Sequence, residues 1–420
     1  MLPGGLRVVT ETVPGSRSAV VGLWVAVGSR DENPASAGAA HFLEHLLFKS
    51  TATRSAASLA AEMDAVGGEI NAFTSKEHTC YYAHVLDCDL ELAVDVVTDV
   101  VLGGLCRSED VEVEREVVLE ELAMRDDDPE DVVSEAATTA LFGNHVLARP
   151  VIGSHDSVSG LTAARLRSFH RRRYTPEKMV LAVAGNVTHA QVVKLARRAF
   201  AGRLDGAAQS APVRTGSRRL PGVPSLDVVT RDGEQSHLVA GTRAYGRFHP
   251  DRWALSVLNT AIGGGLSSRL FQEIREQRGL AYTVYSAVDT YADAGTFTIY
   301  AGCSPERLGE VAAVARTVLE DVRDNGLTVE EVARAKGSLR GGLVLGLEDV
   351  QSRMHRIGRS EINYQNQRTI TRTLSTIERV SAADVNRVAA DVLARPFGGA
   401  VLGPHRGKRG VPATVRNWLG

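Results

Sequence analysis

The most constraining feature of this chain is that the same order of structural signals occurs twice, on either side of a segment without clear periodicity. That segment, Ala201 to Ser225, is rich in Gly, Ala, Pro, Ser and Arg, which is typical of a linker between domains. It divides the 420 residues into two stretches of similar length. We therefore predict an N-terminal domain over residues 1–205, a linker over 206–225 and a C-terminal domain over 226–420.

Both stretches alternate short β-branched segments with longer segments of helical periodicity. In the first, we expect strands at 7–12, 19–29, 69–75, 79–86 and 179–184, and helices at 37–49, 55–66, 90–102, 109–124 and 190–201. In the second, we expect strands at 226–230, 237–242, 282–288 and 295–301, and helices at 251–262, 307–324 and 329–345. In the helix at 109–124, the apolar residues near helical spacing are Val113, Val117 and Leu122.

The two stretches also share local sequence. The segment YAHVLDCDLEL from Tyr82 aligns with FTIYAGCSPER from Phe297, which places Cys88 on Cys303. Further on, Val111-Glu112 aligns with Val332-Ala333 if a few residues are inserted. Several matches in the same order indicate a duplication, although two unrelated domains are the alternative. Because sheet segments alternate with helix pairs, the predicted fold class is α+β, with two homologous domains, each a mainly antiparallel β-sheet packed with α-helices.

Composition and charge exclude several classes of function. The net charge of -2 and the pI of about 6.7 leave no basic excess for nucleic acid or an anionic membrane, so we expect neither as a partner. The longest apolar run, Ala19 to Gly28, is too short to span a bilayer, and the N-terminus shows no signal-peptide pattern. The four cysteines show no paired spacing, which favours a reducing, cytoplasmic compartment. They are Cys80, Cys88, Cys106 and Cys303.

The chemistry is concentrated in the segment AAHFLEHLLFKST. His41 and His45 are four residues apart, so on a helix they project from one face a turn apart, and Glu44 lies beside that face. Two imidazoles at this spacing can hold a tetrahedral zinc ion, and Glu44 is then close enough to take a proton from a metal-bound water. Such histidines can also be surface groups or hydrogen-bonded core groups. However, ionisable residues are costly in so apolar a helix unless they have partners. The apolar neighbours are Phe42, Leu43, Leu46 and Leu47.

A zinc ion of this kind needs a third protein ligand and an open position. The acidic segment VEVEREVVLEEL supplies candidates, since Glu114 and Glu121 are seven residues apart and lie on nearly one stripe of a helix. Acidic runs are most often a solvated helix face. Spacing alone does not choose among Glu114, Glu116, Glu120 and Glu121.

The pattern H-x-x-E-H is the inverted zinc-peptidase motif. Here HFLEH is followed, 121 − 45 = 76 residues later, by Glu121 in an E-R-x-V-[VIL]-x-x-E context. Together these resemble the pitrilysin/insulysin superfamily of zinc peptidases, and within it the bacterial branch similar to the mitochondrial processing peptidase. Further matching segments are LPGGLRVV, GGEINAFTSKEHT, RPVIGS, YTPEKMVLAVAGNV and GGGLSSRLFQEIREQRGLAY. The resemblance implies that His41, His45 and Glu121 bind one zinc ion per chain and that Glu114 supports the site.

The resemblance also implies how a peptide is held. Residues 69–75 would form an edge strand beside the zinc, and Asn71, Ala72 and Phe73 would pair with an extended peptide there. An ordinary internal strand is the alternative. The run from Gly263 to Gly265 lacks the Lys-Ser/Thr of a phosphate loop, so we exclude nucleotide binding.

Arg275 and Tyr282 match a family pair that can hydrogen-bond the scissile carbonyl or its oxyanion. Arg278 and Tyr285 have the same spacing of seven residues. We prefer Arg275 and Tyr282, because the R-x6-Y spacing in which the tyrosine ends an L-[AG]-Y triplet matches the family. The alternative is the end of a surface helix followed by a strand tyrosine.

The function implied by the resemblance is a zinc endopeptidase that cleaves peptides or unfolded segments, with Glu44 activating a zinc-bound water. Two domains are half of the chamber that longer family members close within one chain. A homodimer is therefore expected, in which Arg275 and Tyr282 serve the zinc of the partner chain. The alternatives are a heterodimer with a metal-free sister subunit, a non-catalytic core subunit of a larger complex, and a regulatory partner that rarely uses its metal. Manganese or cobalt could replace zinc, because one of the ligands is a carboxylate.

Overall fold

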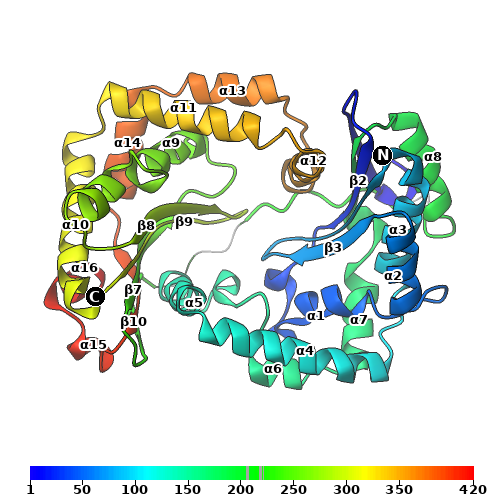
Figure 1. Cartoon of the computed structure of the whole chain (residues 1–420), viewed down its shortest axis with the longest axis horizontal. Helices are drawn as coiled ribbons and strands as arrows, with labels where there is room; N and C mark the ends of the chain where they lie inside the picture. Colours follow the sequence, from blue (N-terminus) through cyan, green and yellow to red (C-terminus); the bar gives the residue numbers. More distant parts are fainter. Residues whose placement is uncertain (205–207, 217–219, 221) are drawn as a thin grey trace. The chain divides into compact units, whose positions relative to one another are not determined.

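The computed structural model describes residues 1–204, 208–216, 220 and 222–420 (Figure 1). Residues 205–207, 217–219 and 221, which belong to the predicted interdomain segment, lie outside the described residues. The chain divides into two compact units, each made of three stretches of sequence. Unit 1 comprises Met1–Ala123, Arg149–Arg214 and Leu345–Arg368. Unit 2 comprises Met124–Ala148, Thr215–Val344 and Thr369–Gly420.

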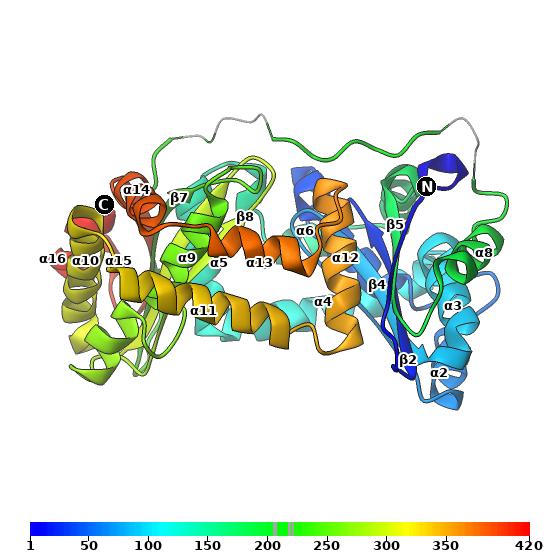
Figure 2. The same cartoon turned by 90° about the horizontal axis from the view of Figure 1, so that it is seen from above.

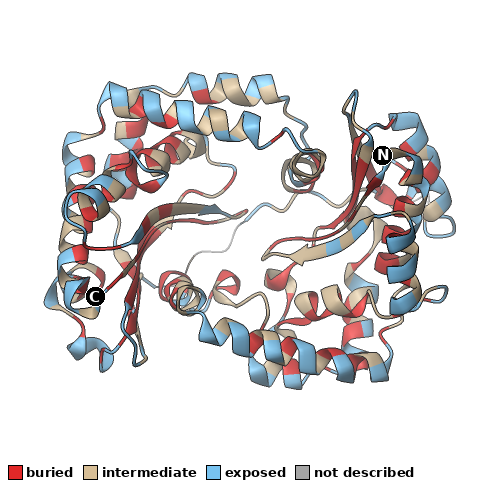
Figure 3. Cartoon of the chain, viewed as in Figure 1, coloured by how far each residue is buried: buried red, intermediate tan, exposed pale blue. Residues whose placement is uncertain are grey.

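Unit 1 is built on a five-stranded sheet with the order β1-β5-β2-β4-β3. The strands are β1 (Arg7–Thr12), β2 (Ser18–Val25), β3 (Glu69–Thr74), β4 (Thr79–Leu86) and β5 (Met179–Gly185). β1 pairs with β5 in parallel, and all the other pairs are antiparallel. β2 and β5 are buried along almost their whole length, as apolar strands covered on both faces are (Figure 3).

Unit 2 repeats this topology with strands from the other half of the chain. Its sheet has the order β6-β10-β7-β9-β8, with β6 and β10 parallel and the other pairs antiparallel. The strands are β6 (Leu226–Thr230), β7 (Ser236–Ala244), β8 (Thr283–Thr290), β9 (Gly295–Cys303) and β10 (Phe397–Gly403). The segments aligned at Tyr82 and Phe297 lie on the equivalent strands β4 and β9. The predicted α+β fold of two homologous domains, each with a mainly antiparallel sheet and packed helices, is confirmed.

Helices from the first half of the chain cover one face of the unit 1 sheet. α1 (Ala39–Leu46), α3 (Leu90–Gly103) and α8 (His189–Ala199) contact its strands, and α7 (Ala163–Arg173) packs against α1. Unit 1 also contains α2 (Ala56–Ala65), α6 (His155–Ser159) and most of α4 (Ser108–Asp127). Leu23, Leu43 and Val97 are fully buried in the shared core.

α4 buries a different stripe of residues from the one that the apolar spacing indicated. Its buried residues are Val111, Glu114, Val118 and Leu122. Val113 and Val117, by contrast, are 60% and 41% exposed. The buried stripe contains a carboxylate that has partners of its own, so apolar periodicity alone does not identify this face.

The second face of each sheet is covered by a helix from the opposite half of the chain. α12 (Val350–Tyr364) packs on β5, β2 and β1 in unit 1, and α5 (Pro129–Phe142) packs on β10, β7 and β6 in unit 2. These two sets of strands are equivalent in the two sheets, so the exchange is reciprocal. The compact units therefore do not follow the contiguous division of the chain expected from its sequence.

α12 lies close to the sheet because a glycine on the helix faces a large side chain of β2, and a glycine on β2 faces a large side chain of the helix. Gly358 of α12 faces Trp24 of β2, and a Cβ atom at this position would lie 2.1 Å from the indole nitrogen. Gly22 of β2 faces Met354 of α12 in the same way, at 2.3 Å from its sulfur. The indole nitrogen of Trp24 donates a hydrogen bond to the Met354 sulfur at 3.4 Å. This interlocking of β2 and α12 leaves no space for a further methyl group.

The remaining helices belong to unit 2. They are α9 (Arg252–Gly263), α10 (Leu308–Asn325), α11 (Val329–Leu345), α13 (Ile370–Glu378), α14 (Ala382–Val392), α15 (Gly407–Gly410) and α16 (Ala413–Leu419). α9 contacts β8 and α14, and α10 contacts α14 and α16 near the C-terminus (Figure 2). A π-helical segment, Phe271–Glu276, lies between α9 and β8 in the sequence. No helix in the described part of the chain is long and apolar enough to cross a membrane.

The interlocked packing predicts that Gly358→Ala destabilises the protein. The added methyl group would collide with the rigid, buried indole of Trp24, and overpacking of this kind costs about 1–3 kcal/mol of the free energy of unfolding. Gly337→Ala on α11 is the matched control, because a Cβ atom there meets nothing within 4 Å and alanine favours a helix. Urea unfolding should give a lower midpoint for Gly358→Ala and an equal or higher one for Gly337→Ala. Equal midpoints for the two variants would contradict the packing argument.

Candidate metal centre

The start of α1 is held in place by one glycine and one buried carboxylate. Gly38, which precedes the helix, has a left-handed φ of 87°, and a Cβ atom there would lie 2.5 Å from the carbonyl oxygen of Ile152. The buried Glu32 accepts hydrogen bonds from the backbone N–H groups of Gly38 at 2.8 Å and Ala40 at 2.7 Å. These contacts set the direction in which α1 leaves the preceding loop.

His41 and His45 project from one face of α1, and their ring centroids lie 4.8 Å apart. The Glu121 Oε2 atom from α4 lies 3.7 Å from the His41 Nε2 atom and 3.4 Å from the His45 Nε2 atom. Ligands of a tetrahedral zinc ion at their usual bond lengths are separated by about 3.3 Å, so this donor set fits zinc. Within the described residues, no other group of three or more His, Cys, Asp or Glu side chains brings its ligand atoms within 4.8 Å of one another.

The structure distinguishes the four glutamates among which spacing alone did not choose a third ligand. Glu121 converges with the two histidines on their Nε2 side. Glu114 is buried, and its Oε2 atom lies 3.3 Å from His45 Nδ1, the other nitrogen of that ring. Glu116 and Glu120 are exposed. A carboxylate on the second ring nitrogen is the arrangement that orients metal-binding histidines in known sites.

The charges around the two imidazoles give them different protonation behaviour. Burial and, to a smaller extent, the neighbouring His45 together lower the pKa of His41 to about 4, so that His41 is neutral at pH 7, as a metal ligand has to be. Burial also lowers the pKa of His45, but the Glu114 hydrogen bond and the nearby carboxylates outweigh this and raise it. Burial raises the pKa of Glu114, but hydrogen bonds with His45 and Lys49 hold it below its ordinary value.

Glu44 lies beside the histidines with one carboxylate oxygen available. Burial raises the pKa of Glu44, while a hydrogen bond with Thr74 at the end of β3 opposes the rise. The Oε2 atom of Glu44 is buried and has no hydrogen-bond partner among the described residues. A carboxylate with a raised pKa and an unused oxygen is suited to accept a proton.

β3 lies at an edge of its sheet, as expected, and among the residues that the structure describes it pairs with β4 alone. The exposed Asn71 accepts a hydrogen bond from the backbone N–H of Ala72 through its Oδ1 atom at 2.7 Å. Phe73 is partly buried, with ring centroids at 5.5 Å from Trp24 and 5.4 Å from His355. The segment therefore offers a free backbone edge, while Phe73 packs into an aromatic cluster on the face that α12 covers.

Arg275 and Tyr282 lie together in unit 2. The Arg275 guanidinium carbon is 4.6 Å from the centroid of the Tyr282 ring and 4.8 Å from that of the Phe271 ring. Arg275 belongs to the π-helical segment, a geometry that often occurs at functional sites. Tyr282 is 79% exposed. Arg278, the other candidate, forms an ion pair with Glu273 at 2.5 Å.

Unit 2 lacks the equivalents of the candidate metal ligands. In the register that aligns Val111 with Val332, Ala335 stands at the position of Glu114 and Gly342 at that of Glu121. α9 contains no His, Cys, Asp or Glu. The duplicated units thus share their topology but not their chemistry.

Sequence reasoning did not identify three residues that surround the site. Glu32 caps α1, Thr74 bonds to Glu44, and Lys49 forms an ion pair with Glu114. The only sequence signal for Lys49 is its position one helical turn after His45, which is too common to be informative. Glu32 and Thr74 come near α1 only through tertiary folding.

The burial of Glu32 predicts a pH dependence of stability. Burial raises the pKa of Glu32 from 4.5 to about 8, although hydrogen bonds from Ala40 and Gly38 oppose the rise. Because the folded pKa lies above the unfolded one, the folded protein binds the proton more tightly. The contribution of Glu32 to the free energy of unfolding therefore falls as the pH rises from 4.5 to about 8.

Urea unfolding in the presence of a chelator measures this effect. The midpoint of the wild type should fall relative to that of Glu32→Gln across this pH interval, since the glutamine does not titrate. Glu310→Gln, at an exposed position on α10, is the control and should stay at a constant offset from the wild type. A constant offset for Glu32→Gln as well would show that Glu32 does not titrate in this way.

Two family models together match most of the chain. Residues 7–155 match the family described as insulinase (peptidase family M16), and residues 160–339 match the family described as peptidase M16 inactive domain. The first match contains His41, Glu44, His45 and Glu121, and the second contains Arg275 and Tyr282. The boundary between the two matches falls before the predicted linker.

Sequence relatives extend over nearly the full length. An uncharacterized zinc protease of Mycobacterium tuberculosis is 61% identical over 419 residues, covering 100% of this chain and 96% of the relative. Uncharacterized zinc proteases of Streptomyces coelicolor and Bacillus subtilis are 50% and 34% identical, over 411 and 400 residues. They cover 97% and 95% of this chain, and 90% and 96% of their own lengths.

Two solved structures have the same fold at low sequence identity. A peptidase M16 inactive domain of Pseudomonas fluorescens superposes with a TM-score of 0.86 at 20% identity, covering 96% of both chains. A protease of Helicobacter pylori superposes with a TM-score of 0.85 at 23% identity, covering 96% of this chain and 98% of its own. Together with the family matches and the full-length relatives, these findings show that the chain belongs to the insulinase family of peptidases, peptidase family M16.

Proposed function

We propose that this chain is a zinc-dependent endopeptidase that cleaves peptides or unfolded segments, with one zinc ion per chain. The observation that supports this most directly is the convergence of His41 Nε2, His45 Nε2 and Glu121 Oε2 beside the Glu44 carboxylate. Two imidazoles and one carboxylate favour zinc over harder cations. These three side chains hold the ion, and Glu114 orients the His45 ring through its second nitrogen.

Zinc bound at this site lowers the pKa of water and polarises a carbonyl group. Glu44 accepts the proton of the attacking water on its unused Oε2 atom. The oxygen of that water forms the new bond to the scissile carbonyl carbon. As the bond between this carbon and the amide nitrogen breaks, Glu44 delivers the same proton to the leaving amine, so the carboxylate is regenerated in each cycle.

The substrate pairs through its backbone with the free edge of β3. Asn71, Ala72 and Phe73 lie on this edge strand, whose last residue, Thr74, bonds to Glu44. Because backbone pairing reads little side-chain identity, broad specificity follows. The exposed Tyr282 hydroxyl and the Arg275 guanidinium stacked on its ring then bond the carbonyl oxygen as it gains negative charge.

The active assembly is a homodimer in which Arg275 and Tyr282 of one chain serve the metal centre of its partner. This follows from the resemblance, in which a two-domain chain is half of a closed chamber. A heterodimer with a sister subunit is the alternative. We place the enzyme in the cytoplasm, because its four cysteines are free thiols in the structure, and we expect no nucleic-acid or membrane partner.

A second candidate function is that of a non-catalytic core subunit. The match of residues 160–339 to a domain described as inactive favours it. That match covers only the part of the chain without the metal ligands, whereas unit 1 keeps the complete ligand set. Measured peptide cleavage separates the two functions.

The mechanism predicts that Glu44→Gln keeps its zinc and loses turnover. Loss of a general base costs roughly 10²–10⁴-fold in kcat, while the ligand side chains are untouched. A fluorogenic peptide assay measures the rate and elemental analysis the zinc content. A chelator should abolish wild-type cleavage, and added zinc should restore it. Wild-type rates in Glu44→Gln would refute the role of Glu44, and no cleavage by zinc-loaded wild type would favour the core-subunit function.

The dimer model predicts that two inactive variants restore one another. Glu44→Gln and Tyr282→Phe chains are unfolded together, refolded as a 1:1 mixture and assayed on the same peptide. If Tyr282 acts in the partner, half of the dimers are mixed and each mixed dimer has one complete site, which gives about a quarter of wild-type activity. Activity no higher than the mean of the two separate variants would show that Tyr282 acts within its own chain.

A further inference from the structure

The segment that follows the metal-bearing helix joins it to two neighbouring helices. We propose that Lys49, the first residue of this segment, is a positioning residue for the metal centre and acts on His45 through Glu114. The inference rests on the proposed zinc site. It adds to that site a cation that does not touch the metal.

The chain of contacts is short. The Lys49 ammonium forms an ion pair with the Oε1 atom of Glu114, whose Oε2 atom lies 3.3 Å from the Nδ1 atom of His45. The Glu114 side chain is only 4% exposed, whereas that of Lys49 is 32% exposed. A buried carboxylate is costly unless it is paired, and the Lys49 ammonium supplies a full positive charge in contact with it. Each of the two Glu114 oxygens therefore has its own partner, which defines the plane of the carboxylate.

Two hydrogen bonds hold the backbone at the start of the segment Lys49–Arg54. The carbonyl oxygen of Lys49 accepts a hydrogen bond at 2.8 Å from the backbone N–H of Ala56, at the start of α2. The carbonyl oxygen of Ser50 accepts one at 3.0 Å from the N–H of Leu105, just after α3. The ammonium group of Lys49 thus extends from a backbone that has little freedom to move.

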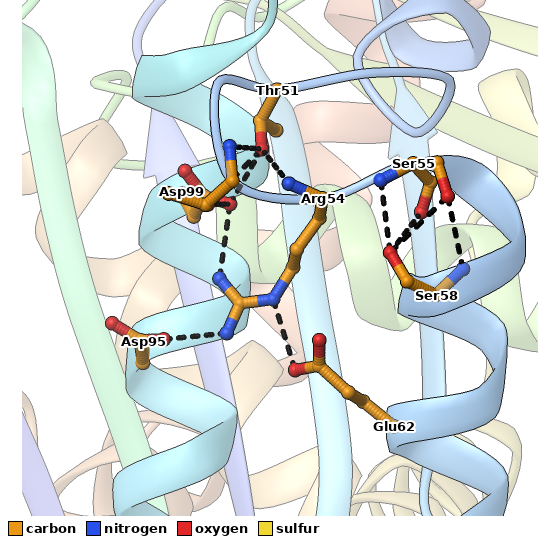
Figure 4. A network of polar contacts seen from close by, with 8 residues as sticks. Thr51, Arg54, Ser55, Ser58, Glu62, Asp95 and Asp99 are labelled. Atoms are coloured by element: carbon orange, nitrogen blue, oxygen red, sulfur yellow. Dashed lines mark hydrogen bonds and ion pairs between the residues drawn. The ribbon is translucent and has the colours of Figure 1, made fainter.

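A network at the end of the segment ties it to α2 and α3 (Figure 4). The Arg54 guanidinium donates hydrogen bonds to Asp95 at 2.7 Å, to Asp99 at 3.0 Å and to Glu62 at 3.0 Å. The Thr51 hydroxyl donates to the same Asp99 oxygen at 2.8 Å. With a guanidinium among three carboxylates from two helices, this end of the segment is anchored independently of the metal centre.

The segment also contacts the helix that carries the third ligand. The Ser50 hydroxyl donates a hydrogen bond to Asp110 at 2.6 Å, and Lys49 pairs with Glu114 one turn further along α4. Glu121 lies two turns beyond Glu114 on nearly the same stripe. Lys49 and Ser50 therefore set the register of α4 against α1, and with it the distance between the Glu121 carboxylate and the two imidazoles.

The test compares Lys49→Met with Lys49→Arg. Methionine keeps the length and apolar stem of lysine without the charge, and arginine restores a cation. Zinc affinity is measured by competition with a chromophoric chelator, and ligand geometry by the visible spectrum of the cobalt-substituted protein. Lys49→Met should bind zinc roughly 10–100-fold more weakly, the usual effect of losing an outer contact of a metal ligand. It should alter the cobalt spectrum and lower kcat more than it changes KM, and Lys49→Arg should recover most of the loss.

A double-mutant cycle shows whether Lys49 acts through Glu114. In a Glu114→Gln background, Lys49→Met should cause little further loss of zinc affinity. Lys194→Met, the same change at an exposed position on α8, is the control and should behave like the wild type. Circular dichroism of the metal-free variants checks that each one folds.

Three results would overturn the inference. They are wild-type zinc affinity and an unchanged cobalt spectrum in Lys49→Met, an equal loss in Lys49→Arg, and full additivity in the cycle. If the wild type binds zinc and cleaves peptide, any of these results refutes only the role of Lys49 and leaves the proposed function standing. If the wild type does not bind zinc, both the proposed function and this inference are refuted.

Discussion

The burial of ionisable side chains against an apolar core is the constraint on which unit 1 depends. α1 presents His41, Glu44 and His45 on a helix whose other residues are largely buried. Groups of this kind are tolerated in such a place only when each finds a partner or a metal ion. Glu121 and Glu114 of α4 meet that need, and Lys49 in turn compensates the charge of Glu114. Ionisable side chains thus join α4 to α1.

The reciprocal exchange of α5 and α12 is the second organising feature. The central strands of both sheets are apolar on both faces, so each sheet needs a second cover besides the helices of its own half. α12 supplies this cover to the sheet beside the candidate metal centre, and ion pairs of Glu11 with Arg353 and Arg356 hold it there. The candidate site is built from the first half of the chain, but the sheet beside it is covered by a helix from the second half.

Local patterns predicted most of the elements but not their partners. β1, β4, β6 and α11 have the bounds that their β-branched or helical periodicity indicated. β10, with its glycine-rich sequence FGGAVLG, was not predicted, because glycine weakens the strand signal. α5 and α12 were also missed, although Asp128 and Asp349 cap them. In α4, the apolar residues Val113 and Val117 are exposed, because the buried stripe contains the charged Glu114.

The sequence by itself determined the duplicated architecture and the trio of His41, Glu44 and His45, because both depend on local spacing along the chain. Spacing also placed the acidic residues on one helix, and resemblance to a family assigned the third ligand among them. Only the tertiary structure decided which carboxylate converges on the imidazoles, which one orients His45, and which cation balances it. It also decided that each sheet takes a helix from the opposite half. These outcomes depend on the register between elements far apart in sequence, and that register is set by packing and by the pairing of buried charges, neither of which a local pattern records.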